Sequence, residues 1–211
     1  MEDSRRRPAA RAAVHPDAAA RNVDALVPHV AQQVGEALRS RGLTLATAES
    51  CTGGLISSWV TSVAGSSGYF RGGVVAYANE AKTALLGVAP ETLQSLGAVS
   101  EETALQMAAG ARHRLGSDLA LSVTGIAGPG GGAPGKPVGL VYIGLATSAS
   151  SRAERHVLRG TRGNIRWSAA VAALQLVLDA LKVPPAGASA HPGDAAAPSQ
   201  AEGTSTGSTA G

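Results

Sequence analysis

The sequence predicts an α/β fold: a layered sandwich in which helices flank a mixed, mostly parallel sheet of about five strands. Two observations lead to this expectation. Short apolar runs alternate along the chain with segments of helical period, which is the pattern of a sheet covered by helices. The last two apolar runs follow each other with no helix between them, so part of the sheet is expected to be antiparallel.

Composition divides the chain into three parts. Residues 1–22 are rich in Ala and Arg and poor in large aliphatic residues, and residues 185–211 are mostly Ala, Gly, Ser, Thr and Pro. Such segments cannot bury a core, so we expect a disordered arm at the start and a disordered tail at the end. The folded domain is predicted to span residues 23–184.

Each expected strand is a short apolar run, and each expected helix has apolar residues at helical spacing or recognisable boundary residues. The strands are expected at residues 43–48, 73–77, 119–123, 139–147 and 154–158. The helices are expected at residues 22–41, 53–63, 79–86, 90–96, 100–115 and 164–181.

Two of the helices have clear boundary signals. Asn79 is the expected N-cap of one helix and Gly87 its expected end. Ser100 and Gly116 have the same roles in the next long helix, because Asn and Ser side chains accept backbone N–H groups and glycine adopts the left-handed conformation that ends a helix.

Several classes of protein are excluded or disfavoured by composition. The single cysteine excludes a disulfide framework and any multi-cysteine metal centre, and the five histidines show no HxH or HExxH spacing, so no metal site is expected. No run of about 18 apolar residues could span a membrane, and no apolar stretch follows the N-terminal arginines as in a signal peptide. We therefore expect a cytoplasmic protein.

The charge pattern is compatible with a small anionic ligand. The formal net charge is +3, which does not require a nucleic-acid partner, and only 3% of residues are aromatic, which leaves few platforms for stacking bases. Arginine outnumbers lysine by 15 to 3. Because lysine is so rare in this chain, each of its lysines is a candidate for a functional role.

Polar and glycine-rich segments follow three of the expected strands. They are residues 49–54 (ESCTGG), residues 77–82 (YANEAK) and residues 124–131 (TGIAGPGG). Ligands bind beyond the carboxyl ends of parallel strands, where helix N-termini point, so these segments are the three candidate places for a site.

In the first segment, Ser50, Cys51 and Thr52 are positioned to meet a substrate. Gly53 and Gly54 would let a ligand approach the backbone, whose free N–H groups could hold an oxyanion or a phosphate. The alternative is a Ser/Thr helix cap with glycines for tight packing. No histidine lies near Cys51 in the sequence, which favours a small buried thiol over a nucleophile.

In the second segment, Lys82 is expected in the first turn of a helix capped by Asn79. There the helix dipole and partial burial would both lower the pKa of Lys82, and a neutral amine can remove a proton from a serine hydroxyl. Tyr77, at the strand end, could donate or relay a hydrogen bond. The alternative for Lys82 is a solvated surface lysine.

The third segment is a glycine loop that lacks the GxxxxGK[ST] pattern of a P-loop. It could cradle a phosphate with its N–H groups or be a long turn. Farther on, Arg159, Arg162 and Arg166 cluster around the start of the last helix. Arg162 is placed to hold a phosphate bidentately, and the alternative is a solvated basic face.

Five motifs, in order, resemble the CinA C-terminal domain family over about residues 28–182. They are TAESCTGG (47–54), AGSSGYFRGGVVAYANEAK (64–82), LGAVSEETA (96–104), SVTGIAGPGGG (122–132) and KPVGLVYIG (136–144). Longer relatives carry an N-terminal molybdopterin-binding-like domain, so this chain resembles the stand-alone form. The characterised activity of the family is nicotinamide-nucleotide amidohydrolase, also called NMN deamidase.

The resemblance implies hydrolysis of nicotinamide mononucleotide to nicotinate mononucleotide and ammonia, without metal or cofactor, in pyridine nucleotide salvage. It implies Ser50 as nucleophile, Lys82 as general base and Tyr77 as an assisting group. It also implies that Thr124 and Arg162 lie in the substrate pocket. The resemblance is compatible with a homodimer.

Other parts of the mechanism are expected from the residues themselves. N–H groups near residues 52–54 are candidates for an oxyanion hole, and residues 128–132, beginning at Gly128, are candidates for phosphate binding with Arg162. Family members often have an acid before this arginine, where the present chain has Thr161.

Three rival classes remain open. The chain could be a non-catalytic nucleotide-binding or competence-related regulatory module, a nucleic-acid-binding protein that uses its arginine arm, or an amidase for another substrate. The joint presence of Ser50, Tyr77 and Lys82 argues against loss of catalysis.

Overall fold

A computed structural model describes residues 29–182 of the chain. The expected arm at residues 1–22, the expected tail at residues 185–211 and both ends of the predicted domain lie outside the described residues.

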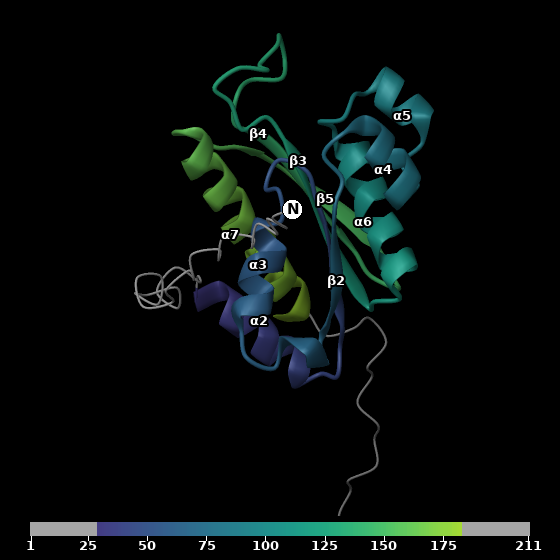
Figure 1. The fold of residues 1–211 in the computed structure, drawn as a ribbon, viewed down its shortest axis with the longest axis vertical. Coiled ribbons are helices and arrows are strands. Elements are labelled where there is room, and N and C mark those ends of the chain that lie inside the picture. Colours follow the sequence, from purple (N-terminus) through teal and green to yellow (C-terminus); the bar gives the residue numbers. More distant parts are fainter. Residues whose placement is uncertain (1–28, 183–211) are drawn as a thin grey trace, which may run out of the picture.

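A five-stranded sheet forms the centre of the molecule, with strand order β2-β1-β3-β4-β5 (Figure 1). β1 pairs in parallel with β2 and β3, whereas β4 is antiparallel to both β3 and β5. All strands except β4 therefore run in the same direction. The mixed, mostly parallel α/β sheet is confirmed, as is its antiparallel part. The strands are β1 (Leu45–Glu49), β2 (Phe70–Val75), β3 (Leu119–Gly125), β4 (Leu140–Ala146) and β5 (Ser151–Val157).

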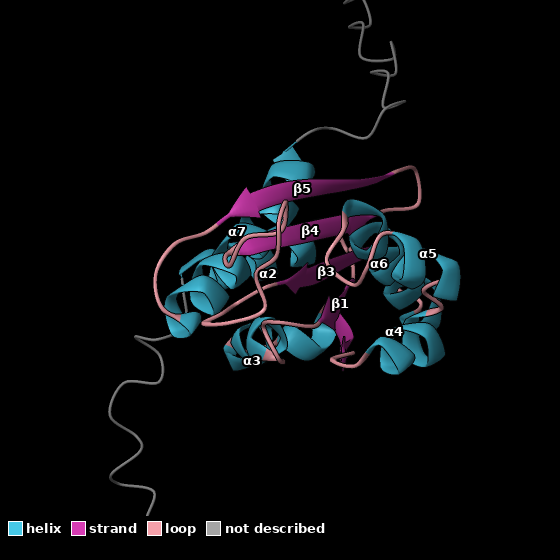
Figure 2. Ribbon diagram, turned by 90° about the horizontal axis from the view of Figure 1, so that it is seen from above, coloured by secondary structure: helices cyan, strands magenta, loops and turns pink. Residues whose placement is uncertain are grey.

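Helices cover both faces of this sheet. One face carries α2 (His29–Arg39), α3 (Leu55–Ser62) and α7 (Arg162–Lys182), and the other carries α4 (Asn79–Leu86), α5 (Pro90–Ser95) and α6 (Glu101–Leu115). Seen from above, the two helical layers lie on opposite sides of the strands (Figure 2). None of the helices within the described range is both long and apolar enough to cross a bilayer.

Two apolar clusters fill the spaces between the sheet and its helical layers. The larger cluster joins the sheet to α2, α3 and α7, and the smaller one joins it to α4 and α6. Small side chains line the buried stripe of α7, including Ala169, Ala170 and Ala173. Because these residues have only a methyl group, the axis of α7 can approach the strands closely, which brings its N-terminal turns near the strand ends.

Most element boundaries agree with the sequence, and some strand or helix starts differ from it. α3 begins at Leu55 and not at residue 53, because Gly53 and Gly54 have φ angles of 61° and 92° and form a turn. β2 begins at Phe70, three residues earlier than expected. β5 begins at Ser151, also three residues early, because this polar edge strand leaves most of its side chains exposed.

The expected cap at Asn79 is wrong. Asn79 is the first residue of α4, the N-cap is Ala78, and no side chain caps this end. Lys82 is therefore the fourth helical residue and not the third. Ser100 does cap α6, because its Oγ accepts the N–H of Thr103 at 3.3 Å. Gly87 and Gly116, which follow α4 and α6, have the expected left-handed conformation.

Candidate active site

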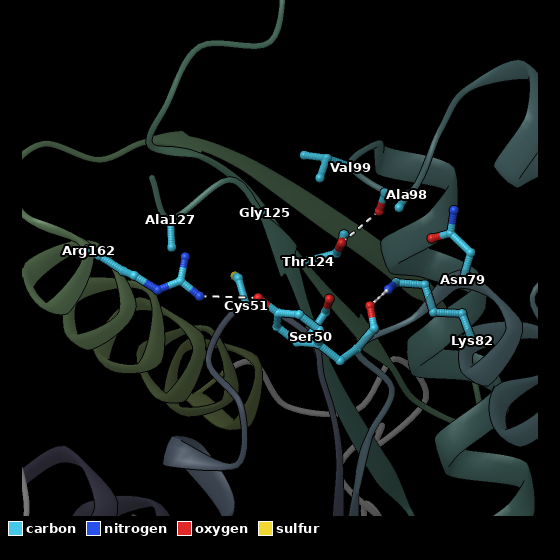
Figure 3. A pocket seen from close by; sticks show the side chains of 11 residues that line it. Ser50, Cys51, Asn79, Lys82, Ala98, Val99, Thr124, Gly125, Ala127 and Arg162 are labelled. Atoms are coloured by element: carbon cyan, nitrogen blue, oxygen red, sulfur yellow. Dashed lines mark hydrogen bonds between the residues drawn. The ribbon is translucent and has the colours of Figure 1, made fainter. Parts of the chain in front are cut away.

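A pocket with a volume of about 200 Å³ opens at the carboxyl ends of β1 and β3. The three polar segments singled out from the sequence all contribute side chains to it, as expected for an α/β sheet. Figure 3 shows these side chains facing a common space. The lining residues are Ser50, Cys51, Tyr77, Asn79, Lys82, Ala98, Val99, Thr124, Gly125, Ala127 and Arg162.

Ser50 lies in the middle of the pocket, between Arg162 on one side and Lys82 on the other (Figure 3). It immediately follows β1 and is 8% exposed. Its backbone N–H donates to the carbonyl oxygen of Val123 on β3 at 2.9 Å. This bond continues the β1–β3 pairing by one residue, so the hydroxyl of Ser50 is held at the edge of the sheet.

Lys82 is buried, with only 1% of its surface exposed. Its Nζ donates to the carbonyl oxygens of Ala76 and Tyr77, both at 3.0 Å. No carboxylate within residues 29–182 forms an ion pair with it. Burial lowers the pKa of Lys82 from its ordinary value of 10.5, because the charged form loses its hydration. The structure therefore contradicts the alternative of a solvated surface lysine.

Tyr77 contacts Lys82 through its carbonyl and not through its hydroxyl. The phenol is 63% exposed, and its oxygen accepts a hydrogen bond from Nη2 of Arg162 at 3.1 Å. Nη1 of the same arginine donates to the carbonyl oxygen of Gly128 at 2.9 Å. The guanidinium thus bridges the end of β2 and the glycine loop across the pocket mouth. Gly128 is outside the pocket lining, and its carbonyl oxygen is the acceptor for Arg162.

Thr124 lines the pocket near the end of β3. Its hydroxyl donates to the carbonyl oxygen of Ala98 at 2.6 Å (Figure 3). This bond fixes the loop before α6 against the sheet. Ala98 and Val99, on that loop, form an apolar wall of the pocket; they lie in the LGAVSEETA motif, but no role in a site was expected for them from the sequence.

Thr52, Gly53 and Gly54 do not reach the pocket. Thr52 is fully buried, and its hydroxyl has no hydrogen-bond partner in the described part of the chain. The N–H of Gly53 donates to the carbonyl of Ser50 at 3.1 Å, and that of Gly54 donates to Glu49 Oε2 at 2.9 Å. The expectation that these two glycines offer free N–H groups is therefore wrong, because the turn and the neighbouring carboxylate use both.

Glu49 organises this turn, and the sequence reading overlooked it. Its carboxylate is fully buried and accepts the N–H groups of Gly54, Ile56 and Ser57 at 2.8–3.1 Å. It also accepts the hydroxyl of Ser57 at 2.6 Å. An acid next to the first turn of an expected helix was the available signal, because carboxylates stabilise helix N-termini.

Cys51 lines the pocket beside Ser50 but is poorly suited to attack. It is 6% exposed, and burial raises the pKa of its thiol from 9.0 to about 11. At neutral pH the thiol is therefore protonated, and the thiolate is the nucleophilic form. This agrees with the expectation of a small buried thiol.

Two further polar residues matter here. Asn79, read as a helix cap in the sequence, presents its amide at the pocket edge instead (Figure 3). Arg166, on α7, donates to the carbonyl oxygens of Cys51 and Thr52.

Within residues 29–182, no group of three or more His, Cys, Asp or Glu side chains is arranged to hold a metal ion.

Fold and site together define an α/β sandwich with a small polar pocket at its strand ends, in which a serine and a buried lysine face the same space. The family model for the CinA C-terminal domain matches residues 28–181, and the chain belongs to this family.

Known relatives agree with this assignment. A CinA-like protein of Kosmotoga olearia is 54% identical over 144 residues, covering 68% of this chain and 35% of the relative. A CinA-like protein of Chloroherpeton thalassium is 63% identical over 118 residues, covering 56% and 28%. The chain thus spans about a third of the length of the curated relatives it matches.

Solved structures show the same fold. The competence/damage inducible protein CihA from Agrobacterium tumefaciens aligns with a TM-score of 0.71 at 43% identity, covering 74% of this chain and 94% of that protein. A CinA superfamily protein from Klebsiella pneumoniae 700603 aligns with a TM-score of 0.71 at 32% identity, covering 73% and 96%.

Proposed function

We propose that this chain hydrolyses the carboxamide of nicotinamide mononucleotide, releasing ammonia and nicotinate mononucleotide, with Ser50 as nucleophile and Lys82 as general base. The observation that carries the proposal is the arrangement of Lys82 Nζ in the pocket that also contains Ser50. A neutral amine has two N–H bonds and one lone pair. Nζ has two carbonyl acceptors, Ala76 and Tyr77, which leaves the lone pair to accept a proton.

The reaction would proceed in two stages. Ser50 Oγ attacks the amide carbon while its proton moves to Lys82 Nζ. The tetrahedral intermediate then collapses, the C–N bond breaks, and Lys82 returns the proton to the departing ammonia. Water, activated by the same amine, hydrolyses the acyl-enzyme and regenerates the serine hydroxyl.

The surroundings of the dyad suit an anionic nucleotide. Arg162 lines the pocket opposite Lys82, and its side chain is held by the Tyr77 hydroxyl and the Gly128 carbonyl. A phosphate at the pocket mouth would gain charge-assisted hydrogen bonds from this guanidinium. The apolar wall at Ala98 and Val99 offers a surface for the pyridine ring.

The test is ammonia release from nicotinamide mononucleotide by the purified chain with EDTA present. We expect release by the wild type and none above background from Ser50→Ala, because the attacking oxygen is gone. The matched control is Ser58→Ala, which removes an exposed hydroxyl from α3 and should keep the wild-type rate.

Each result separates the candidate functions. Undiminished release by a folded Ser50→Ala variant would remove the serine from its role. Nucleotide binding by the wild type without ammonia release would favour the rival class, a non-catalytic nucleotide-binding or regulatory module. Ammonia release from other amides alone would keep the mechanism and change the substrate.

A further inference from the structure

The turn after Ser50 uses nearly all of its backbone donors internally. The N–H groups of residues 53–57 are all hydrogen-bonded, two to carbonyls within the turn and three to the carboxylate of Glu49. The N–H groups of Cys51 and Thr52 make no hydrogen bond to any described residue. They follow the proposed nucleophile directly, where acyl-transfer enzymes commonly place an oxyanion donor.

The orientation of each free N–H group is fixed by a hydrogen bond to the carbonyl oxygen of the same peptide. In a trans peptide the C=O and N–H point in opposite directions. The carbonyl of Ser50 accepts the N–H of Gly53, which fixes the peptide that carries the N–H of Cys51. The carbonyl of Cys51 accepts Nε of Arg166 at 3.2 Å, which fixes the peptide that carries the N–H of Thr52.

Arg166 also holds the next carbonyl along the turn. Its Nη2 donates to the carbonyl oxygen of Thr52 at 2.7 Å. A planar guanidinium can bind two neighbouring oxygens in a fixed geometry, which an ammonium cannot do. Arg166 is partly buried and is absent from the pocket lining, so it acts on the turn and not on the ligand.

We propose that Arg166 is a positioning residue that locks the Cys51–Thr52 peptide, so that the N–H of Cys51, a residue that lines the pocket, serves as the oxyanion donor for attack by Ser50. This inference rests on the proposed role of Ser50 as an acyl-transfer nucleophile, but it does not depend on the identity of the amide.

The step that the oxyanion hole assists is the formation of the tetrahedral intermediate. Ser50 Oγ forms a bond to the carbonyl carbon, the π electron pair moves to the carbonyl oxygen, and the hydroxyl proton passes to Lys82. The new negative charge on that oxygen is stabilised by the N–H donor of Cys51. Donors that are already oriented add no reorganisation cost when the charge develops, and loss of one such donor typically costs about 10²–10³-fold in kcat.

The first test is the kinetics of Arg166→Met with nicotinamide mononucleotide. We expect kcat to fall by about 10²-fold, as for loss of an oxyanion donor, and KM to stay close to the wild-type value. The reason is that a turn released from Arg166 can shift the N–H of Cys51 away from the oxyanion, while the ligand contacts around Arg162 and Thr124 are unchanged.

Two variants separate positioning from a general effect on stability. Arg166→Lys keeps the charge but cannot hold both carbonyls, so it should recover only part of kcat. Arg41→Met is the matched control: Arg41 also donates to backbone carbonyls, those of Ala37 and Leu181, but at the far end of α7. It should lower the melting temperature and leave kcat unchanged.

A second readout does not require the natural substrate. An aryl sulfonyl fluoride reacts with an activated serine, and its sulfonyl oxygens take up negative charge in the hole that would hold the oxyanion. We expect mass spectrometry to show sulfonylation of Ser50 in the wild type and in Arg41→Met, and a rate lower by about 10²-fold in Arg166→Met.

The two readouts distinguish the inference from the proposed function. If the wild type does not hydrolyse the nucleotide but its sulfonylation depends on Arg166, the positioning role stands and the proposed substrate fails. An Arg166→Met variant with wild-type kcat, or with a raised KM and unchanged kcat, would overturn the positioning role. So would Ser50 that is neither acylated nor sulfonylated in the wild type.

Discussion

A buried carboxylate and a buried amine lie at neighbouring strand ends in the pocket region, and their surroundings differ in opposite ways. Glu49, at the end of β1, accepts three backbone N–H groups and one hydroxyl. Lys82, after β2, has only two carbonyl partners and no carboxylate within residues 29–182. Burial lowers the pKa of Lys82, because the loss of hydration of its charge outweighs the opposing effects of Cys51 and Glu80.

Under the proposed mechanism, this difference separates a structural group from the general base. The hydrogen bonds of Glu49 satisfy its lone pairs and tie the turn after β1 to the first turn of α3, so the group contributes stability. Lys82 is held in place by two carbonyl oxygens, and in the proposed mechanism its lone pair accepts the serine proton. A buried charge with few partners costs stability, which is common where a group must change its protonation state.

Glu49→Gln should have the largest effect on folding. The amide keeps the shape of the side chain, but its NH₂ group would face backbone N–H donors, and the negative charge at the start of α3 is lost. We expect the free energy of unfolding to fall by about 3 kcal/mol, measured by urea denaturation.

The matched variant is Glu80→Gln, in the first turn of α4. Glu80 is exposed, so this change should cost no more than about 0.5 kcal/mol. Equal losses in the two variants would show that the hydrogen bonds of Glu49 contribute nothing beyond a helix-end charge.

Lys82 should determine the pH dependence of the reaction. Because its pKa is lowered, the neutral base becomes available below the ordinary value of 10.5, and kcat/KM should rise with pH until Lys82 is deprotonated. Lys82→Met should lower kcat by at least about 10²-fold and remove the rise of kcat/KM with pH. The measurement is the pH–rate profile of both proteins.

The lowered pKa of Lys82 also makes the stability of the fold depend on pH. The folded chain binds the Lys82 proton less tightly than the unfolded chain does, so the contribution of this residue to stability increases with pH between the folded pKa and 10.5. Lys182→Met, which removes an exposed lysine, should change neither profile. A Lys82→Met enzyme with a wild-type pH–rate profile would assign the base to another group.

Cys51→Ala should have the smallest effect. We expect most of the activity to remain, because the substitution keeps the backbone N–H and removes a protonated thiol, at a cost of about 1 kcal/mol in stability. The folded state holds the thiol proton more tightly than the unfolded state, so this stabilisation is lost as pH rises from 9.0 to about 11. That loss should be absent in the variant.

Alkylation provides a direct check on the same thiol. Iodoacetamide should modify Cys51 slowly in the native protein and rapidly in urea, because modification requires an exposed thiolate. Rapid native modification, together with loss of activity in Cys51→Ala, would identify the protein as a thiol amidase.

Local signals predicted much of the fold. The cap at Ser100, the glycines after α4 and α6 and the direct succession of the last two strands each follow from the chemistry of a few neighbouring residues. β5 was predicted too short, since an edge strand needs no apolar alternation on its solvated side. The strand order was not predictable, because pairing of β1 with β3 depends on contacts between residues far apart in the sequence.

The candidate site divides in the same way. The sequence motifs placed Ser50, Lys82 and Arg162 correctly in one pocket, because residues after parallel strands converge. The availability of the backbone donors was misjudged. Whether an N–H is free depends on partners that only the folded chain brings together, here the carboxylate of Glu49, which accepts three of these N–H groups.

The start of α7 supplies both arginines that hold the pocket, and it follows every other pocket residue in the chain. Synthesis proceeds from the N-terminus, so Ser50 and Lys82 leave the ribosome before Arg162 and Arg166 do. A nascent chain that ends before Arg162 already contains Ser50 and Lys82, yet it lacks the guanidinium that holds the carbonyls of Cys51 and Thr52. The order of translation therefore delays the completion of the pocket until the sheet has its final helix.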